Sequence, residues 1–216
     1  MSNSTTFRRL KIRSGKSSSI LALLRLIELK SGILYVDGID LSTVPRQAIR
    51  SAITALPQDP VILPGSIREN MDLESRYTAD DGALTVALQK VQLWDAVRES
   101  GGLDVEFVES SFSVGQQQLV CLARCLLNHG KVILLDEATS SVDHTTEILV
   151  REVLKCEFAD CTVIEVLHRL DTIMDYDKVV VMQDGAVAEV GRPADLLQST
   201  ESLFRQIWDA QNVVLT

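Results

Sequence analysis

The chain has 216 residues, of which 46% are hydrophobic and 24% charged. This suits one globular domain, or one core with a subdomain, and excludes a disordered protein. A formal net charge of −9 and an aromatic content of 5% argue against nucleic-acid binding, which needs basic surfaces and stacking platforms. No apolar run approaches the about 20 residues of a membrane helix, and the N-terminus does not read as a signal peptide. Any membrane-spanning part would therefore lie elsewhere.

Residues 10–18 contain the second half of a phosphate-binding loop. In the pattern G-x-x-x-x-G-K-[ST], Gly15, Lys16 and Ser17 occupy the last three positions, whereas Leu10 replaces the first glycine. Glycines serve such a loop because its backbone adopts dihedral angles closed to other residues while its amides surround a phosphate. Residues 1–9 are polar, so we expect no buried strand before the loop and a gap in the sheet.

The apolar spacing after this loop predicts a helix over 17–29 with one broad buried face. Its N-terminus would present amides and the positive end of the helix dipole to an anion. Lys16 would add a positive charge for the outer phosphates, and the Ser17 hydroxyl would bind Mg²⁺. The alternative is that this Lys-Ser pair merely begins a helix.

The middle of the chain changes from strands to helices. A short strand at 33–36, a turn at Asp37-Gly38 and a core strand at 53–56 come first. Gln58 follows, and taken alone it is only a polar loop residue. Helices are then expected at 66–71, around 83–97 and at 113–127, where Ser113 suits the N-cap. Gly115 would let the backbone approach a phosphate closely.

Residues 131–143 contain an apolar run followed by two acids. Residues 132–135 predict a strand covered on both faces, as in a parallel sheet. Asp136 and Glu137 follow where that strand ends, and ligands bind at the carboxyl ends of parallel strands. Burying adjacent acids is costly unless a cation lies nearby, so this pattern indicates a metal–phosphate site. A core strand that runs into a solvated turn would give the same pattern.

The last third of the chain predicts an amphipathic helix from 143 to about 155, and a strand at 162–167 that ends at His168. A histidine in such a place can also be a hydrogen-bonded core residue. A hairpin over 178–190 and two short helices complete the chain. The cysteines show no metal or disulfide spacing, and we expect free thiols, two of them in the core. They are Cys121, Cys125, Cys156 and Cys161.

Taken together, these motifs resemble the nucleotide-binding domain of ATP-binding-cassette (ABC) proteins over roughly residues 13–200. They correspond to the end of a Walker A loop, the Q-loop at Gln58, the signature at 113–116, Walker B ending in Asp136-Glu137, the D-loop at 141–143 and the switch His168. The resemblance extends to the second nucleotide-binding domain of the multidrug-resistance-associated exporters of fungi. The stretches that carry it are SVGQQQLVCLARCLL, LLDEATSSVD and HRLDTIMDYDKVVVMQDGAVAEVG.

The resemblance implies an α/β fold: a P-loop NTPase (RecA-like) core with a predominantly parallel sheet and an inserted α-helical subdomain. Residues 1–64 would be the truncated N-terminal part of the core, 65–130 the helical subdomain and 131–216 the C-terminal part. We read the N-terminus as a truncation or an erroneous join near Arg13, which replaces a further glycine of the family's loop. An upstream β layer, with the aromatic residue that stacks on adenine, is also missing from this chain.

The resemblance also implies ATP as the substrate and Mg²⁺ as the cofactor. The implied catalytic residues are Glu137, His168 and Gln58, with Glu137 polarising the attacking water. The implied ATP-binding residues are Gly15, Lys16, Ser17 and Ser18, and the implied Mg²⁺ ligands are Ser17, Gln58 and Asp136. A partner nucleotide-binding domain in a head-to-tail dimer would hold the ATP that faces Ser113, Val114, Gly115, Gln116 and Asp143.

The expected function is ATP hydrolysis that powers export at the cytosolic face of a membrane, with transmembrane domains outside this chain and no nucleic acid bound. Turnover by this chain is left open, because its Walker A loop is damaged. The alternative is a degenerate or truncated cassette that binds nucleotide weakly, or serves only as a dimer-interface module. A soluble ABC-type ATPase of chromosome maintenance or repair is disfavoured by the negative charge and the absence of long coiled-coil heptads.

Overall fold

The computed structural model describes residues 7–12, 16–77, 80–128, 130–166 and 173–212. The strands are β1 (Phe7–Ile12), β2 (Tyr35–Val36), β3 (Ile39–Asp40), β4 (Ile53–Leu56), β5 (Val132–Asp136), β6 (Thr162–Val166), β7 (Lys178–Gln183) and β8 (Ala186–Gly191). The α-helices are α1 (Lys16–Leu23), α2 (Arg46–Ala52), α3 (Ile67–Met71), α4 (Asp81–Lys90), α5 (Trp94–Glu99), α6 (Val114–Leu127), α7 (His144–Glu157), α8 (Pro193–Gln198) and α9 (Leu203–Asn212). Short 3₁₀ helices are η1 (Leu41–Thr43), η2 (Glu109–Ser111) and η3 (Ile173–Asp175).

The chain divides into two compact units. Residues Met1–Ile53, Lys131–Glu137 and Asp160–Thr216 form the first unit, and Thr54–Gly130 and Ala138–Ala159 form the second. The first unit holds the strands β5, β6, β1, β7 and β8, and the second holds most of the helices. In the part of the chain that the structure describes, no helix is long and apolar enough to cross a membrane.

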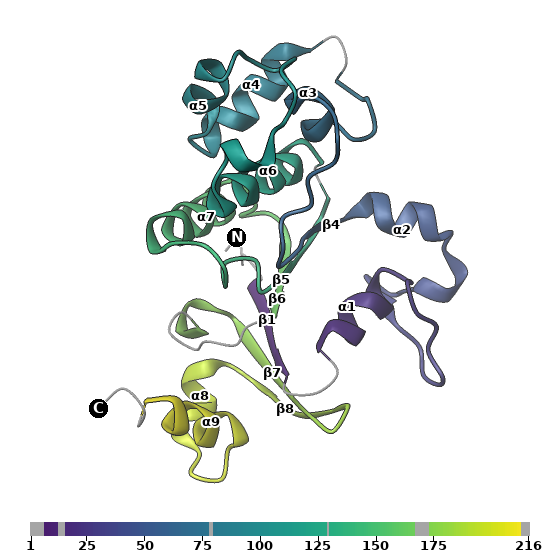
Figure 1. Ribbon diagram of the computed structural model, residues 1–216. Helices are drawn as coiled ribbons and strands as arrows, with labels where there is room; N and C mark the ends of the chain where they lie inside the picture. Colours follow the sequence, from purple (N-terminus) through teal and green to yellow (C-terminus); the bar gives the residue numbers. More distant parts are fainter. Residues whose placement is uncertain (1–6, 13–15, 78–79, 129, 167–172, 213–216) are drawn as a thin grey trace. The chain divides into compact units, whose positions relative to one another are not determined.

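The sheet of the first unit has the strand order β5-β6-β1-β7-β8, with β1 in its middle (Figure 1). β5, β6, β1 and β7 are parallel, and β8 is antiparallel to β7. The prediction that no strand precedes the loop, and that the sheet has a gap, is wrong. On β1, Leu10 pairs with Val166 on β6 and with Val180 on β7. A strand with neighbours on both sides satisfies its backbone hydrogen bonds there, even though arginine and lysine interrupt its apolar pattern.

Helix α1 is shorter than the predicted helix over 17–29. It ends at Leu23 because the backbone of Arg25 takes the left-handed conformation, with φ at 48°. The amide of Arg25 then donates to the Ala22 carbonyl, and the amide of Leu26 donates to the Leu21 carbonyl. This is the Schellman motif, usually formed with glycine. Arginine at that position gives no sequence signal for the helix end.

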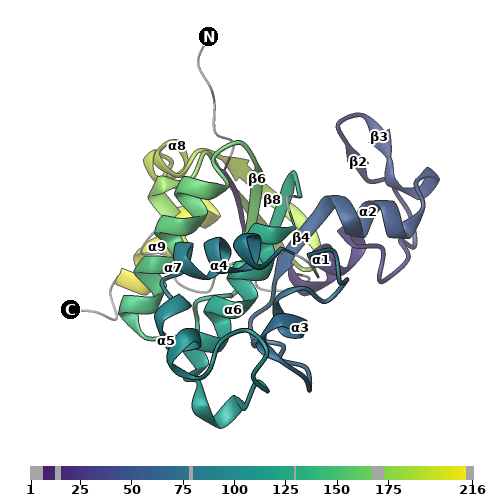
Figure 2. The same cartoon turned by 90° about the horizontal axis from the view of Figure 1, so that it is seen from above.

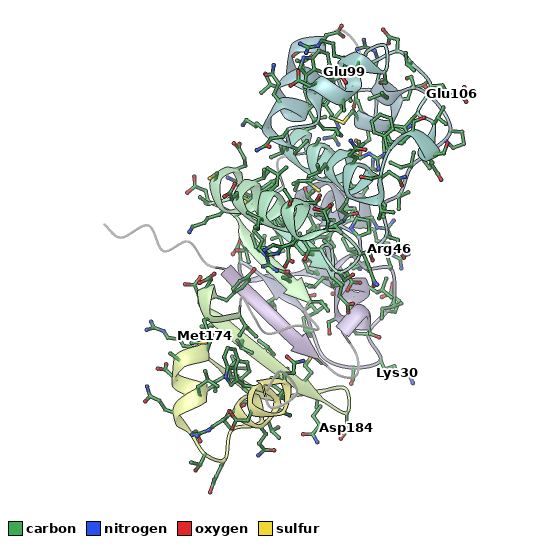
Figure 3. The ribbon with its side chains drawn as sticks, turned by 60° about the vertical axis from the view of Figure 1, so that its left-hand side comes forward. Lys30, Arg46, Glu99, Glu106, Met174 and Asp184 are labelled. Carbon is green, nitrogen blue, oxygen red and sulfur yellow. The ribbon has the colours of Figure 1, made fainter. Side chains whose placement is uncertain are left out.

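Strand β5 is covered on both faces, as predicted, because the consecutive residues Ile133, Leu134 and Leu135 are all buried. On one face Leu134 belongs to a cluster with Val166 of β6 and with apolar residues of α1, η1 and α2. The predicted hairpin is also confirmed: β7 and β8 turn at Asp184 and Gly185, both with positive φ. Asp184 lies at the tip of this hairpin (Figure 3).

In the second unit, α6 runs beside α4 and α7 (Figure 2). The helix expected around 83–97 is two helices, because Gln92 adopts a φ of 54° and ends α4 with the same motif as Arg25. The predicted placement of the cysteines is confirmed. Two of the four cysteines, Cys121 and Cys125, are buried on α6.

Candidate functional site

The acids at the end of β5 have an unusual backbone. Asp136 and Glu137 are both half-buried. Glu137 has a φ of 51°, and its amide donates to the Val166 carbonyl at 3.2 Å. A left-handed non-glycine residue is uncommon and is found at turns and active sites. The β5–β6 pairing thus extends one residue past the strand and fixes the backbone that carries the Glu137 carboxylate.

The predicted phosphate-binding segment lies between β1 and α1 of the same unit. Lys16 and Ser17 are the first residues of α1, and Ser18 is exposed in its first turn. Gly15 and His168 lie outside the described residues. Leu10 is placed inside β1 rather than in a loop, because β1 continues to Ile12. The stretch from the end of β1 to α1 is therefore shorter than a loop that begins at position 10.

The signature segment begins α6 in the second unit. Ser113 is the N-cap, as predicted: its hydroxyl accepts from the Gln116 amide at 3.1 Å. The Gln116 side chain in turn accepts from the Ser113 amide at 2.9 Å, which completes a capping box. Ser113 and Val114 are exposed, Gln116 is half-buried and Gly115 is buried. Two reciprocal hydrogen bonds therefore fix the start of this helix, and the apolar side chain of Val114 is exposed next to them.

Asp143 lies beside the signature segment, at the N-terminus of α7. Its carboxylate accepts from the Thr146 amide at 3.0 Å and from the Thr146 hydroxyl at 2.7 Å. These hydrogen bonds from Thr146 hold the pKa of the exposed Asp143 carboxyl below its usual value. A Cβ atom at Gly115 would lie 3.2 Å from Asp143 Oδ2 and 2.9 Å from Thr146 Oγ1. The segments 113–116 and 141–143 therefore meet within one unit.

Gln58 is exposed in the loop after β4, in the second unit. Its neighbour Pro57 is tied to α6, because the buried Gln118 amide group donates to the Pro57 carbonyl at 2.9 Å. Farther along α6, the buried Arg124 guanidinium donates to the Val61 carbonyl and to both the carbonyl and side-chain oxygens of Asn70. One helix thus carries the signature segment and fixes the chain on both sides of Gln58.

The predicted site residues therefore fall into two groups. Asp136 and Glu137 share the first unit with the start of α1, and the signature residues share the second unit with Asp143 and Gln58. Sequence reasoning missed Thr146 and Gln118. Thr146 occupies the third position after an N-cap aspartate, which is a detectable capping pattern, but no pattern indicates that its hydroxyl reaches the aspartate or that it contacts Gly115.

The sequence profile of ABC transporters matches residues 14–140, more than half of the chain. The chain belongs to the ABC transporter family. It is 45% identical over 195 residues to the "ABC multidrug transporter B" of Aspergillus fumigatus. It is 43% identical over 197 residues to the "ABC transporter C family member 5" of Arabidopsis thaliana. Each alignment covers 90% of this chain and 13% of the transporter, so the chain spans a small part of these relatives.

Among solved structures, a bacterial Atm1-family ABC exporter with ATP bound matches with a TM-score of 0.86 and 29% identity. This match covers 96% of the chain and 37% of that exporter chain. Together with the parallel sheet and its helices, it confirms the predicted α/β fold of a P-loop NTPase. The predicted resemblance to ABC transporters, including C-family and fungal ones, is confirmed as well.

Proposed function

We propose that this chain is the nucleotide-binding domain of an ABC exporter, and that it binds Mg·ATP and hydrolyses it to power export. The observation that carries the proposal is the register of three parallel strands. Asp136 on β5 pairs with Val166 on β6, which pairs with Leu10 on β1. At about 4.8 Å per strand spacing, the acids lie roughly 10 Å from β1 at the carboxyl edge of the sheet. β1 precedes α1 in the sequence, which supports the proposal of a phosphate and metal site at that edge.

The residues present fit Mg²⁺. No described group of three or more His, Cys, Asp or Glu could hold a metal by itself, whereas Asp136 offers one half-buried carboxylate. Mg²⁺ is commonly bound by one or two carboxylates together with substrate phosphates, rather than by a cage of protein ligands. Ser17, Gln58 and Asp136 would hold the ion through hard oxygen atoms. When bound, Mg²⁺ would neutralise charge on the phosphates.

In the proposed reaction, a water molecule attacks the γ-phosphorus of ATP. The bond from that phosphorus to the β–γ bridging oxygen breaks, and ADP and inorganic phosphate leave, with the water's proton passing to phosphate or solvent. Glu137 accepts a hydrogen bond from the water and polarises it, while Lys16 stabilises the negative charge that develops on the phosphates. Gly15, Ser17 and Ser18 add to ATP binding. Gln58 and His168 orient the water and the γ-phosphate.

The signature segment of the second unit would act on the ATP of a partner cassette. Ser113, Val114, Gly115 and Gln116 form a rigid surface segment next to Asp143, which suits contact with a nucleotide held by another nucleotide-binding domain in a head-to-tail dimer. We further propose that 1–64 and 131–216 form the nucleotide-binding core and that 65–130 form the helical subdomain. The chain would act together with the transmembrane domains of the exporter, at the cytosolic face of the membrane.

A second candidate is a cassette that binds nucleotide weakly and does not turn it over. Arg13, in place of a loop glycine, favours it, as does Leu10, which lies in β1 rather than in the loop. The experiment that separates the two is the release of inorganic phosphate from Mg·ATP by the full chain, with Asp136→Asn as the paired variant. We expect slow turnover by the parent chain, and weakened Mg²⁺-dependent ATP binding by the variant. ATP binding by the parent without any turnover would favour the second candidate, and no ATP binding would contradict both.

A further inference from the structure

Thr146 donates a hydrogen bond to each of the two carboxylate oxygens of Asp143. Oδ1 accepts from the Thr146 backbone amide, which is the ordinary N-cap bond of α7. Oδ2 accepts from the Thr146 hydroxyl at 2.7 Å. Capping the helix requires only the first of these bonds, which satisfies a backbone amide of the helix N-terminus. The bond from the Thr146 hydroxyl is therefore additional to the cap. It fixes the rotation of the carboxylate, which a single bond would leave free.

The same two polar atoms fill the space beside Gly115. A side chain there would meet Thr146 Oγ1 at 2.9 Å, Asp143 Oδ2 at 3.2 Å and Thr146 Cγ2 at 3.4 Å. Real Cβ atoms essentially never approach another atom within 3.0 Å, so no residue but glycine fits without a shift. The N-terminal turn of α6 therefore packs against the side chains of Asp143 and Thr146.

We propose that Thr146 is a positioning residue, whose hydroxyl fixes the Asp143 carboxylate against Gly115 and so joins segments 113–116 and 141–143 into one rigid surface. This inference rests on the proposed function, in which both segments face the ATP of a partner cassette. It deepens that function by assigning Asp143 a positioning role. Its carboxylate joins the two segments and does not contact the nucleotide. Thr146 itself touches no nucleotide.

The capping box of α6 makes the effect of Thr146 separable from helix formation. Ser113 and Gln116 satisfy each other's amides without help from α7, so α6 can begin at the same residue when the Thr146 hydroxyl is removed. What changes is the position of α6 relative to the 141–143 segment. Thr146→Val removes only the donor and keeps the branched shape, while Thr146→Ser keeps the donor and loses the methyl group.

The experiment uses the full chain with Glu137→Gln, which is expected to prevent turnover, and adds Thr146→Val, Thr146→Ser or Thr146→Ala. Thr145→Val is the matched control, because Thr145 is the exposed neighbour on α7. The first readout is amide hydrogen exchange at 113–117 and 141–147 without nucleotide. The second readout is the dissociation constant of the dimer formed with Mg·ATP, measured by sedimentation. The ATP affinity of the monomer is measured in parallel.

For Thr146→Val we expect about tenfold faster exchange in these two segments and about tenfold weaker dimerisation, the size of one lost hydrogen bond. Monomer ATP affinity should not change, and Thr146→Ser and Thr145→Val should behave like the parent. Thr146→Ala should repeat the result if the valine variant does not fold. Equal exchange in parent and Thr146→Val, or faster exchange without weaker dimerisation, would overturn the inference. Should the parent not dimerise with Mg·ATP, the proposed dimer fails, and the exchange result alone decides whether Thr146 joins the segments.

Discussion

Gly115 and Asp143 are in direct packing contact, although 27 positions separate them in the sequence. The carboxylate Oδ2 of Asp143 would lie 3.2 Å from a Cβ atom at position 115. From the sequence alone, the glycine is explained by the approach of a phosphate. The structure adds a second reason, because two motif segments of the same unit can touch only where α6 lacks a side chain.

Replacing Gly115 with alanine is therefore expected to destabilise the chain. The added methyl group overpacks the contact with Thr146 and Asp143, which costs about 1–3 kcal/mol. The matched control is Gly82→Ala, since Gly82 also occupies the second position of a helix and, among the described residues, its Cβ would meet Asp80 alone, at 3.2 Å. Urea denaturation of both variants measures the difference. Equal free energies of unfolding for the two alanine variants would show that Gly115 is not constrained by packing.

The stability of the chain is expected to fall in acid partly through Asp143. Its pKa is lowered from 3.8 by the hydrogen bonds from Thr146, so the ionised form stabilises the folded state. This contribution is complete above the unfolded pKa and is lost as the pH falls through the lower folded pKa. Glu69 and Asp104 also have lowered pKa values. Part of the loss of stability in acid will therefore remain when Asp143 is replaced.

The measurement is the free energy of unfolding at a series of pH values from neutral to below 3.8. Asp143→Asn, which cannot ionise, should show a smaller loss of stability in acid than the parent. Thr146→Val should also show a smaller loss, because it removes the largest cause of the shift. An unchanged acid slope in both variants would mean that the Asp143–Thr146 hydrogen bonds do not persist in solution.

Arg124 is expected to be among the most sensitive positions of the second unit. Its guanidinium is buried, and burial lowers its pKa. It supplies the donor for two oxygens of Asn70 and for the Val61 carbonyl. Arg124→Met leaves these acceptors without that donor, at a cost of about 1–3 kcal/mol. Arg98→Met is the control, since Arg98 is exposed and pairs with the exposed Asp95, and such a pair contributes about 0–1 kcal/mol. Thermal melts with equal midpoints would contradict this role of Arg124.

Sequence patterns predicted the elements that have clear local signals. The continuous apolar run of β5, the capping residue Ser113 and the Asp184-Gly185 turn each depend on side chains that prefer those conformations. The strand β1 was missed because its position in the middle of the sheet is set by backbone pairing with β6 and β7, over residues that alternate poorly in polarity. The ends of α1 and α4 were missed because Arg25 and Gln92 adopt a conformation that glycine normally marks.

The candidate site, like the fold, could be predicted from the sequence only in part. Asp136, Glu137 and the signature segment could be found because each forms a contiguous pattern in the sequence. Thr146 could not be assigned a role, because its importance comes from a contact between α6 and α7. The left-handed backbone of Glu137 was equally hidden, since it follows from the pairing of β5 with β6 rather than from a local preference of glutamate.

The affinity for Mg·ATP is expected to be low, with a dissociation constant in the millimolar range, or about −4 kcal/mol. Arg13 replaces a loop glycine, and Leu10 lies within β1, so few amides remain to surround the phosphates. Arg13→Gly should therefore tighten binding. Leu10→Gly should not, because it weakens a central strand by roughly 0.5–1 kcal/mol without adding to the loop. Equilibrium titration tests both variants, and micromolar binding by the parent would contradict the expectation.

The most direct test of the proposed function is ATP turnover by a Glu137→Gln variant, compared with Glu201→Gln, which changes an exposed acid of the same unit. Glutamine keeps the shape of Glu137 but removes the charge that polarises the attacking water. The measurement is phosphate release under saturating Mg·ATP, with ATP binding determined in parallel. We predict that Glu137→Gln loses most turnover and retains ATP binding, while Glu201→Gln matches the parent. Turnover by Glu137→Gln at the parent rate would contradict the assignment of Glu137 as the residue that activates water.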